Sequence, residues 1–173
     1  HGGRAELPSA SVVVRCTDSG ARGLHSASPG RVMLQDYREA LEEFRPHVVL
    51  CCWQPLGQDW TAEIRRTPSV VEYILVGEAD TGVCGRLWET WGVREDAAVG
   101  CVSTSEEEEE DEDGSEYCKP TPPHCRDGFE RCDLGVLSKL QICCTDERWL
   151  TRGRSSTVCF RRRMDRPGEP ADS

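Results

Sequence analysis

Polar and aromatic side chains follow two apolar runs in the middle of the chain. Gln54-Pro55 comes directly after the run Val48–Trp53, and Glu78 follows the run Val70–Val76. The carboxyl ends of neighbouring parallel strands meet at one edge of a sheet, where α/β proteins bind their ligands. A carboxylate there can orient a substrate or act as a general base, and an indole can pack against a planar group. We therefore take Glu78 as the candidate catalytic residue, and as candidate substrate-facing residues Trp53, Gln54, Pro55 and Trp60.

Each of these residues also has a structural interpretation. Glu78 lies in the turn sequence Gly77–Gly82, where a solvated carboxylate can accept hydrogen bonds from backbone amides. The two tryptophans can equally pack in the core. Cys84 is a candidate reactive thiol, although no base stands near it in the sequence. The sequence leaves these alternatives open.

The two apolar runs predict buried parallel strands, because neither alternates with polar residues. Between them, Asp59 is placed to cap a helix over Trp60–Arg66, and Pro68 should stop that helix. Strand, helix and strand within so short a stretch form a βαβ unit. The edge that carries Trp53 and Glu78 is then the ligand-binding edge of the sheet.

Upstream elements repeat this order. Ser11–Cys16 and Val32–Leu34 read as short strands, the first ending near Asp18. Asp36 has the spacing of a helix-capping residue, with Glu39 three residues later. The helix predicted after it buries one apolar face, made of Tyr37, Ala40, Leu41 and Phe44.

The downstream part predicts an insertion followed by an antiparallel hairpin. Residues 95–127 are acidic and contain prolines, so we expect a disordered insertion. Asp133 is placed to cap a short helix, and Gln141–Thr145 and Ser156–Arg161 should pair as antiparallel strands. The fold class is therefore α/β, with a mostly parallel sheet and a C-terminal antiparallel hairpin. The expected organisation is a lead-in (1–10), β/α units (11–94), the insertion (95–127), a C-terminal helix and hairpin of the same domain (128–163) and a tail (164–173).

Charge and cysteine content narrow the functional classes. Eight consecutive acids, Glu106–Asp113, account for most of the formal net charge of −10, and no basic face predicts nucleic-acid binding. The acidic run is expected to be a linker, with a basic protein partner such as a histone or ribosomal tail as the alternative. No apolar run is long enough to span a membrane. The adjacent pairs Cys51-Cys52 and Cys143-Cys144 lie in apolar, strand-like runs, which favours a reduced, intracellular protein of the cytoplasm or nucleus.

A zinc site is a weaker possibility. Its ligands would be Cys118, His124, Cys125 and Cys132. Six residues separate each cysteine from the next, whereas one arm of a structural zinc site usually has about two to four. Scattered thiols in and beside a loop are the preferred interpretation, and no metal is assigned.

The order of elements resembles the class I S-adenosylmethionine-dependent methyltransferase fold, from its second strand to its seventh. The segments V-V-L-C-C-W-Q-P-L-G-Q-D-W-T and Y-I-L-V-G-E-A-D-T-G-V-C-G are similar to those of a poorly characterised branch of methyltransferase-like proteins. The match covers residues 11–163 without the acidic insertion. It implies a three-layer Rossmann-like sheet and S-adenosylmethionine as the cofactor.

The resemblance also implies roles for particular residues. Asp18 matches the acidic residue that binds the ribose hydroxyls of the cofactor, and Asp36 lies near the position that contacts the adenine. Asp36 competes for that role with its own capping function. Trp53, Gln54 and Pro55 match the segment that faces the methyl group and an unknown methyl acceptor. Holding nucleophile and methyl group in line supplies much of the rate of such a reaction.

One part of the family pattern does not match. The first strand of that fold carries a glycine-rich cofactor loop and lies between the second and fourth strands. Only ten residues precede Ser11, and they contain no apolar strand. We therefore expect an incomplete methyltransferase-like gene product, inactive as this chain, which binds S-adenosylmethionine only if the missing N-terminal segment is present. The alternative is a non-enzymatic Rossmann-like interaction protein.

Overall fold

The computed structural model describes residues 11–23, 26, 30–78, 84–94, 120–141 and 155–164. Contacts within the chain divide it into two compact units, His1–Phe44 and Arg45–Ser173. Each unit is described by itself below. Together they contain helices and two sheets, which confirms the α/β class.

Among its described residues, the first unit contains a small parallel sheet and the helix α2. Strand β1 (Cys16–Asp18) pairs with β2 (Val32–Leu34), and Cys16 lies opposite Val32. The prediction of a strand over Ser11–Cys16 was therefore wrong in its bounds. Val12, Val13 and Val14 are exposed, because the described strand partner β2 begins only opposite Cys16.

Helix α2 (Tyr37–Phe44) follows β2, at the place predicted for a helix after Asp36. The Asp36 Oδ1 atom accepts a hydrogen bond from the Arg38 N–H at 2.9 Å, so the predicted cap is confirmed. Leu41 is buried, and the charged side chains Glu39 and Glu42 are exposed. The amphipathic pattern thus oriented this helix correctly.

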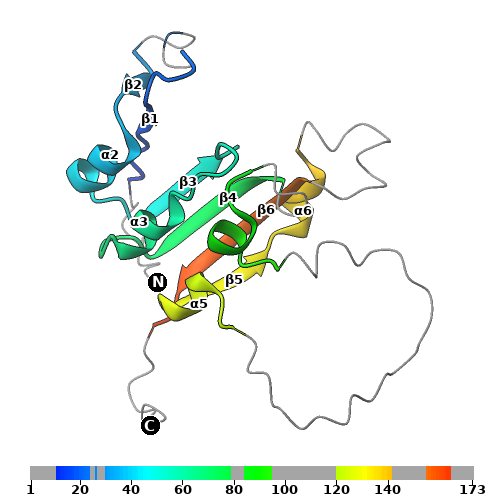
Figure 1. The fold of residues 1–173 in the computed structure, drawn as a ribbon. Coiled ribbons are helices and arrows are strands. Elements are labelled where there is room, and N and C mark those ends of the chain that lie inside the picture. Colours follow the sequence, from blue (N-terminus) through cyan, green and yellow to red (C-terminus); the bar gives the residue numbers. More distant parts are fainter. Residues whose placement is uncertain are drawn as a thin grey trace, which may run out of the picture. The chain divides into compact units, whose positions relative to one another are not determined.

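The second unit is built on a four-stranded mixed sheet with the order β3-β4-β6-β5 (Figure 1). Strands β3 (Val48–Cys52) and β4 (Glu72–Glu78) are parallel, and helix α3 (Thr61–Arg66) connects them. This confirms the predicted βαβ unit. Strand β6 (Ser155–Arg162) runs antiparallel to both of its neighbours, β4 and β5 (Phe129–Asp133). Strands β3, β4 and β5 therefore run in one direction and β6 runs against them, so this sheet is mixed.

The predicted C-terminal hairpin is replaced by a different pairing. Most of the expected partner Gln141–Thr145 lies outside the described residues, and β6 is instead inserted between β4 and β5. Asp133 does not cap a helix: it ends β5 and pairs with Arg131, whose Nη2 lies 2.9 Å from its Oδ1. The N-cap position of helix α6 (Gly135–Lys139) is Leu134, which makes no side-chain capping bond.

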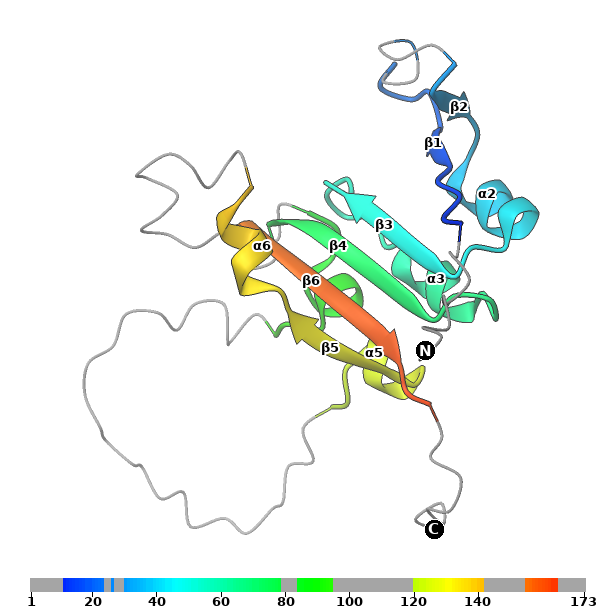
Figure 2. The ribbon, with the colours of Figure 1, turned by 180° about the vertical axis from the view of Figure 1, so that it is seen from behind.

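Short helices cover one face of this sheet. Helix α3, the π-helix η1 (Leu87–Trp91) and helix α5 (Pro123–Arg126) lie in front of the strands in Figure 1 and behind them in Figure 2. Helix α5 falls within the range expected for the insertion, of which residues 95–119 lie outside the described part. Within the described ranges, no helix combines the length and apolarity that crossing a membrane requires.

An aromatic cluster forms the core beneath these helices. Tyr73 of β4 and Phe160 of β6 are register partners, and their rings stack with centroids 4.6 Å apart. Phe129 of β5 meets Tyr73 edge-on at 5.3 Å. All three side chains are fully buried, and such pairs contribute roughly 0.5–1.5 kcal/mol each beyond their buried area.

The opposite face is much less covered by the described residues. Val48, Leu50 and Cys52 alternate along β3 and share this face, and Leu50 is 63% exposed. In the described part of the sheet, β3 pairs only with β4, so its other edge is open.

Candidate functional site

The ends of β3 and β4 form the predicted edge, and Trp53 lies where the parallel ladder finishes. The Trp53 N–H donates a hydrogen bond to the Val76 carbonyl at 2.8 Å, which holds Trp53 beside the end of β4. Its φ of 55° lies in the left-handed region, which costs a non-glycine residue roughly 1–2 kcal/mol. The side chain remains 45% exposed, so the chain turns sharply here and presents an indole to solvent at the edge.

Gln54 is the most unusual polar residue at this edge, because it is only 4% exposed. Its side-chain Nε2 donates to the Gln58 backbone carbonyl at 2.5 Å. Its backbone carbonyl accepts a hydrogen bond from the Gly85 N–H at 3.2 Å. Its Oε1 is buried and has no hydrogen-bond partner among the described residues. An unsatisfied buried acceptor costs about 1–3 kcal/mol, so this oxygen is suited to a donor group of a ligand.

Further hydrogen bonds fasten the loop after β3 to the segment after β4. The Gly57 N–H donates to the Gly85 carbonyl at 2.9 Å, and the Arg86 Nε donates to the Gly57 carbonyl at 2.9 Å. Pro55 is half-buried and its carbonyl accepts from the Gln58 N–H, which closes a turn. The substrate-facing residues of the prediction therefore lie on a loop that is held at both ends.

Glu78 is the last residue of β4 and is 6% exposed. It lies opposite Ser155 of β6, so the strand ladder rather than a solvated turn positions it. The thiol of Cys84 fills the space over Gly77, where an added Cβ would lie 2.9 Å from its Sγ. Burial raises the pKa of Cys84, and a hydrogen bond with the Glu78 backbone opposes this while the charge of Glu78 adds to it. The pKa is raised overall, so this thiol stays protonated at neutral pH. Glu78 therefore remains the candidate for acid–base chemistry, and Cys84 does not act as a thiolate.

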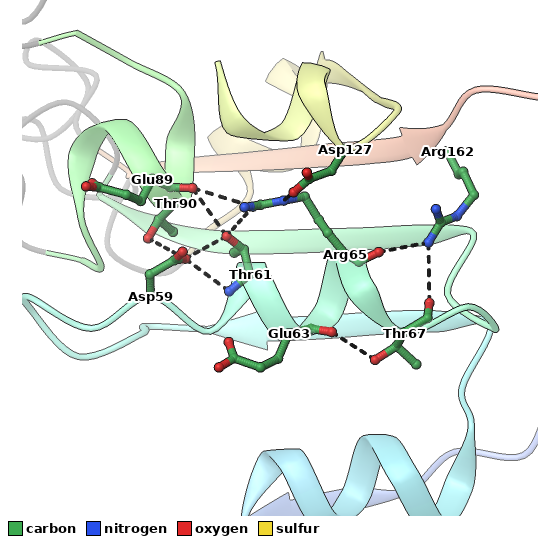
Figure 3. A network of polar contacts seen from close by, with 9 residues as sticks. All are labelled: Asp59, Thr61, Glu63, Arg65, Thr67, Glu89, Thr90, Asp127 and Arg162. Atoms are coloured by element: carbon green, nitrogen blue, oxygen red, sulfur yellow. Dashed lines mark hydrogen bonds and ion pairs between the residues drawn. The ribbon is translucent and has the colours of Figure 1, made fainter. Parts of the chain in front are cut away.

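Asp59 organises a polar network on the helical face rather than a ligand site (Figure 3). Its Oδ1 accepts hydrogen bonds from the Thr61 N–H at 3.0 Å, the Thr61 hydroxyl at 2.6 Å and the Thr90 hydroxyl at 3.1 Å. The first bond satisfies the Thr61 N–H at the start of α3, but the N-cap position of this helix is Trp60, which makes no side-chain capping bond. The predicted cap by Asp59 is therefore one residue away from the cap position of the structure. Trp60, at the start of α3, donates its Nε1–H to the Gln58 Oε1 at 3.0 Å. Asp59, Trp60 and Thr61 therefore stabilise the fold through these hydrogen bonds.

Arg65 extends this network across three helices. Its side chain is nearly completely buried, and its Nε lies 2.6 Å from the Asp127 Oδ2 just after α5. Its Nη1 donates to the Thr61 hydroxyl at 2.5 Å (Figure 3). Sequence reasoning missed both Arg65 and Thr90. The available signal was the position of Arg65 four residues after Thr61, on the same side of α3.

Replacing Asp59 with alanine tests the network. We expect Asp59→Ala to lower the free energy of unfolding by about 2 kcal/mol, because it removes the acceptor of the Thr61 N–H at the helix start and of the buried Thr90 hydroxyl. Urea unfolding followed by tryptophan fluorescence measures the loss, since all five tryptophans lie in the second unit. Asp59→Asn, which retains an acceptor oxygen, should lose less than half as much. Equal losses for the two variants would show that this acceptor oxygen does not stabilise the network.

The two residues expected to hold the cofactor belong to the first unit. The Asp18 Oδ1 accepts a hydrogen bond from the Gly20 N–H at 2.8 Å, at the carboxyl end of β1. Asp36 caps α2 and lies 3.9 Å from Arg38. The structure thus brings Gln54 and Glu78 to one edge of the second unit, and it places Asp18 and Asp36 near the strand ends of the other unit.

The alternative zinc site finds no support in the described residues. No group of three or more potential ligands comes together among them, and Cys118 lies outside their range. His124 is instead buried with its ring edge-on against Phe160, at a centroid distance of 5.0 Å.

Comparisons of the chain with protein families, with curated proteins and with solved structures found no match.

Proposed function

We propose that the chain carries a class I S-adenosylmethionine-dependent methyltransferase-like domain of the three-layer Rossmann-like type. In this proposal the edge formed by Trp53, Gln54, Pro55 and Glu78 faces the methyl acceptor. The observation that supports it best is the strand order of the two units.

One of the two common doubly wound sheets has the strand order 3-2-1-4-5-6, and the other has 2-1-3-4-5. The class I methyltransferase fold adds a seventh, antiparallel strand between the fifth and the sixth. Without its first strand, that sheet would divide into a parallel pair and a group of four in the order 4-5-7-6. The chain has a parallel pair, β1-β2, and a group of four, β3-β4-β6-β5, in which only β6 is antiparallel to its neighbours. The agreement extends to β5 and β6, whose pairing was not expected from the sequence.

The residues fit one part of the cofactor and leave another part without a match. Asp18 ends β1, and a carboxylate at that position suits two ribose hydroxyls. Asp36 already uses one oxygen to cap α2, so adenine contact would fall to its other oxygen or to the backbone. None of the described strands occupies the position of the first strand with its glycine-rich loop. S-adenosylmethionine, when bound, supplies an electrophilic methyl group.

The chain's own contribution is to position the methyl acceptor. The buried Oε1 of Gln54 is suited to accept a hydrogen bond from an N–H or O–H of the acceptor. The exposed indole of Trp53 can pack against a flat group beside it. Glu78 can take a proton from the acceptor if its chemistry requires a base. Correct orientation supplies much of the rate of a direct transfer, so a strong base is not required.

The test is direct titration with S-adenosylmethionine by calorimetry. A form of the protein that carries a strand and a G-x-G loop ahead of His1 should bind at micromolar Kd, and Asp18→Asn should weaken its binding about tenfold, as expected for a lost charge-assisted hydrogen bond. The 173-residue chain is the control and should bind far more weakly. Asp36→Asn, which keeps a capping oxygen, should change the Kd less than Asp18→Asn.

A binding protein without enzymatic activity is the second candidate. The open edge of β3 and the exposed Val48 and Leu50 favour it, because such an edge can pair with a strand of another chain. If the extended form failed to bind S-adenosylmethionine at millimolar concentration, the methyltransferase proposal would be refuted and this second function preferred.

A further inference from the structure

Two thiols lie directly opposite each other on neighbouring strands of the second unit. Cys132 of β5 and Cys159 of β6 are register partners. Directly opposed residues of an antiparallel pair place their side chains on the same face of the sheet. Both cysteines are in the free thiol form. They are therefore neighbours in the fold although 26 residues separate them in the sequence.

The hydrogen bonds at the two ends of this ladder define the geometry of the pair. The Leu134 N–H donates to the Thr157 carbonyl at 2.9 Å, and the Arg163 N–H donates to the Gly128 carbonyl at 2.7 Å. Because such bonds occur at every second pair, the two cysteines form a hydrogen-bonded pair, with Cα atoms about 5.5 Å apart. Disulfides span Cα distances of roughly 4.4–6.8 Å. The backbone thus already has the spacing that a disulfide requires.

The surroundings of the two thiols differ in a way that suits stepwise oxidation. Cys132 is exposed, whereas Cys159 is fully buried. The Sγ of Cys159 donates a hydrogen bond to the Glu72 Oε1 at 3.2 Å, and the Arg161 Nε holds the other oxygen of Glu72 at 3.1 Å. Burial, together with the charge and hydrogen bond of Glu72, raises the pKa of Cys159 to about 11. Cys159 therefore stays protonated until a base takes its proton, and the nearest carboxylate already accepts its hydrogen bond.

We propose that Cys132 and Cys159 are a redox couple, which small-molecule disulfides such as glutathione disulfide convert reversibly into a cross-strand disulfide with Glu72 as the proton acceptor. This inference is independent of the proposed methyltransferase-like function. It assigns a modification site to the sheet face opposite the helices.

The oxidation proceeds in two balanced exchange steps. The Cys132 thiolate attacks glutathione disulfide, forms a mixed disulfide and releases one glutathione thiolate. The Cys159 sulfur then attacks the Cys132 sulfur, Glu72 takes the Cys159 proton, and the second glutathione leaves as a thiolate that is protonated in turn. Two protein thiols are thereby oxidised, and one glutathione disulfide is reduced to two glutathione molecules. Excess glutathione reverses both steps.

The resulting bond should be easy to reduce. Opposed Cβ atoms in a sheet lie about 4.5–5.5 Å apart, whereas a disulfide needs about 3.5–4.5 Å. The strands must therefore move together slightly, and strained disulfides have higher reduction potentials than relaxed structural ones. This property suits a reversible bond rather than a permanent link.

The test is oxidation of the reduced protein in glutathione buffers, followed by alkylation and mass spectrometry. Trypsin should release Cys132–Lys139 and Ser155–Arg161, each with a single cysteine. We expect these two peptides to be linked to each other in most of the oxidised protein. Cys16, which is exposed and opposite Val32, is the internal control and should carry glutathione without forming a link. In 8 M urea the preference for the 132–159 link should disappear.

Variants separate the two steps. Cys132→Ser should abolish the link, and because Cys132 is exposed this variant should fold normally. Glu72→Gln should leave the first step unchanged and slow closure at least tenfold, so that the mixed disulfide on Cys132 accumulates. A circular dichroism spectrum equal to that of the parent protein checks its fold. The redox couple would be disproved if the folded protein gave no 132–159 link, or if links were spread evenly over its eleven cysteines. Closure of the disulfide at an unchanged rate in Glu72→Gln would show that Glu72 is not the proton acceptor.

Discussion

Gly92→Ala should destabilise the second unit by about 4 kcal/mol. Gly92 ends the π-helix η1 with a φ of 69°, and its N–H donates to the Trp88 carbonyl at 2.9 Å. An alanine there meets the left-handed penalty of about 1–2 kcal/mol. Its Cβ would also lie within 2.7 Å of the Nδ1 of His124, a buried ring that packs on Phe160 and has little room to move. Overpacking of this kind adds roughly 1–3 kcal/mol.

Gly128 is the matched control for this substitution. Its φ of 79° is similar, but no atom lies within 4 Å of an added Cβ. Gly128→Ala should therefore lose only the conformational part, about 1 kcal/mol. Urea unfolding of both variants measures the difference, and a double variant with His124→Ala should recover about 2 kcal/mol of the loss. Equal losses for Gly92→Ala and Gly128→Ala would show that the imidazole makes no contact of consequence.

The second large effect is a loss of stability in mild acid, caused by His124. Burial, together with the charges of Arg131, Arg65 and Arg163, lowers the pKa of its imidazole to about 4 against the opposing effect of Asp127. In the unfolded chain the same imidazole titrates near 6.5. Between pH 6.5 and about 4 the unfolded state therefore binds a proton that the folded state does not. The stabilisation is complete above pH 6.5 and is lost as the pH falls, to a total of about 3 kcal/mol.

His124→Gln isolates this contribution, because the variant has no group that titrates at this position. The free energy of unfolding should be measured from pH 7.5 to 4.5 for both proteins, with the carboxylates contributing equally to each. We expect the parent protein to lose stability faster, so that the difference between the two curves shrinks or reverses as the pH falls. Parallel curves would mean that His124 titrates in the folded protein as it does in water.

The sequence alone predicted the elements whose local signals agree with their tertiary surroundings. Strands β3 and β4 are apolar runs that bury at least one face, and α3 begins just after Asp59 and ends before Pro68. In each case the residues that fix the element lie inside it or within two residues of its ends. Pattern and cap therefore suffice to locate them.

Strand β5 shows what such signals cannot supply. Its sequence, Phe129-Glu130-Arg131-Cys132-Asp133, buries only Phe129, so it has no period of two to recognise. It is a strand because β6 lies beside it, and β6 is distant in the sequence. Pairing of this kind depends on tertiary context rather than on local propensity.

The candidate site, too, could be predicted from the sequence only in part. The position of Gln54 and Glu78 at the ends of neighbouring strands follows from the βαβ pattern, and the structure brings them to one edge as predicted. Their burial does not follow from the pattern. It depends on Gly85 and Arg86 closing over the loop and on β6 placing Ser155 opposite Glu78, and both are long-range contacts.

The central position of β6 has a consequence for synthesis on the ribosome. Strand β4 and the residues of β5 emerge well before β6, which pairs with both. At about 5–20 residues per second, the nascent chain spends several seconds with the edges of β4 and β5 unsatisfied. During that interval the apolar residues of β4 have no neighbour on one side and are available to molecular chaperones. Completion of the second unit is therefore a late event that depends on a few residues near the end of the described chain.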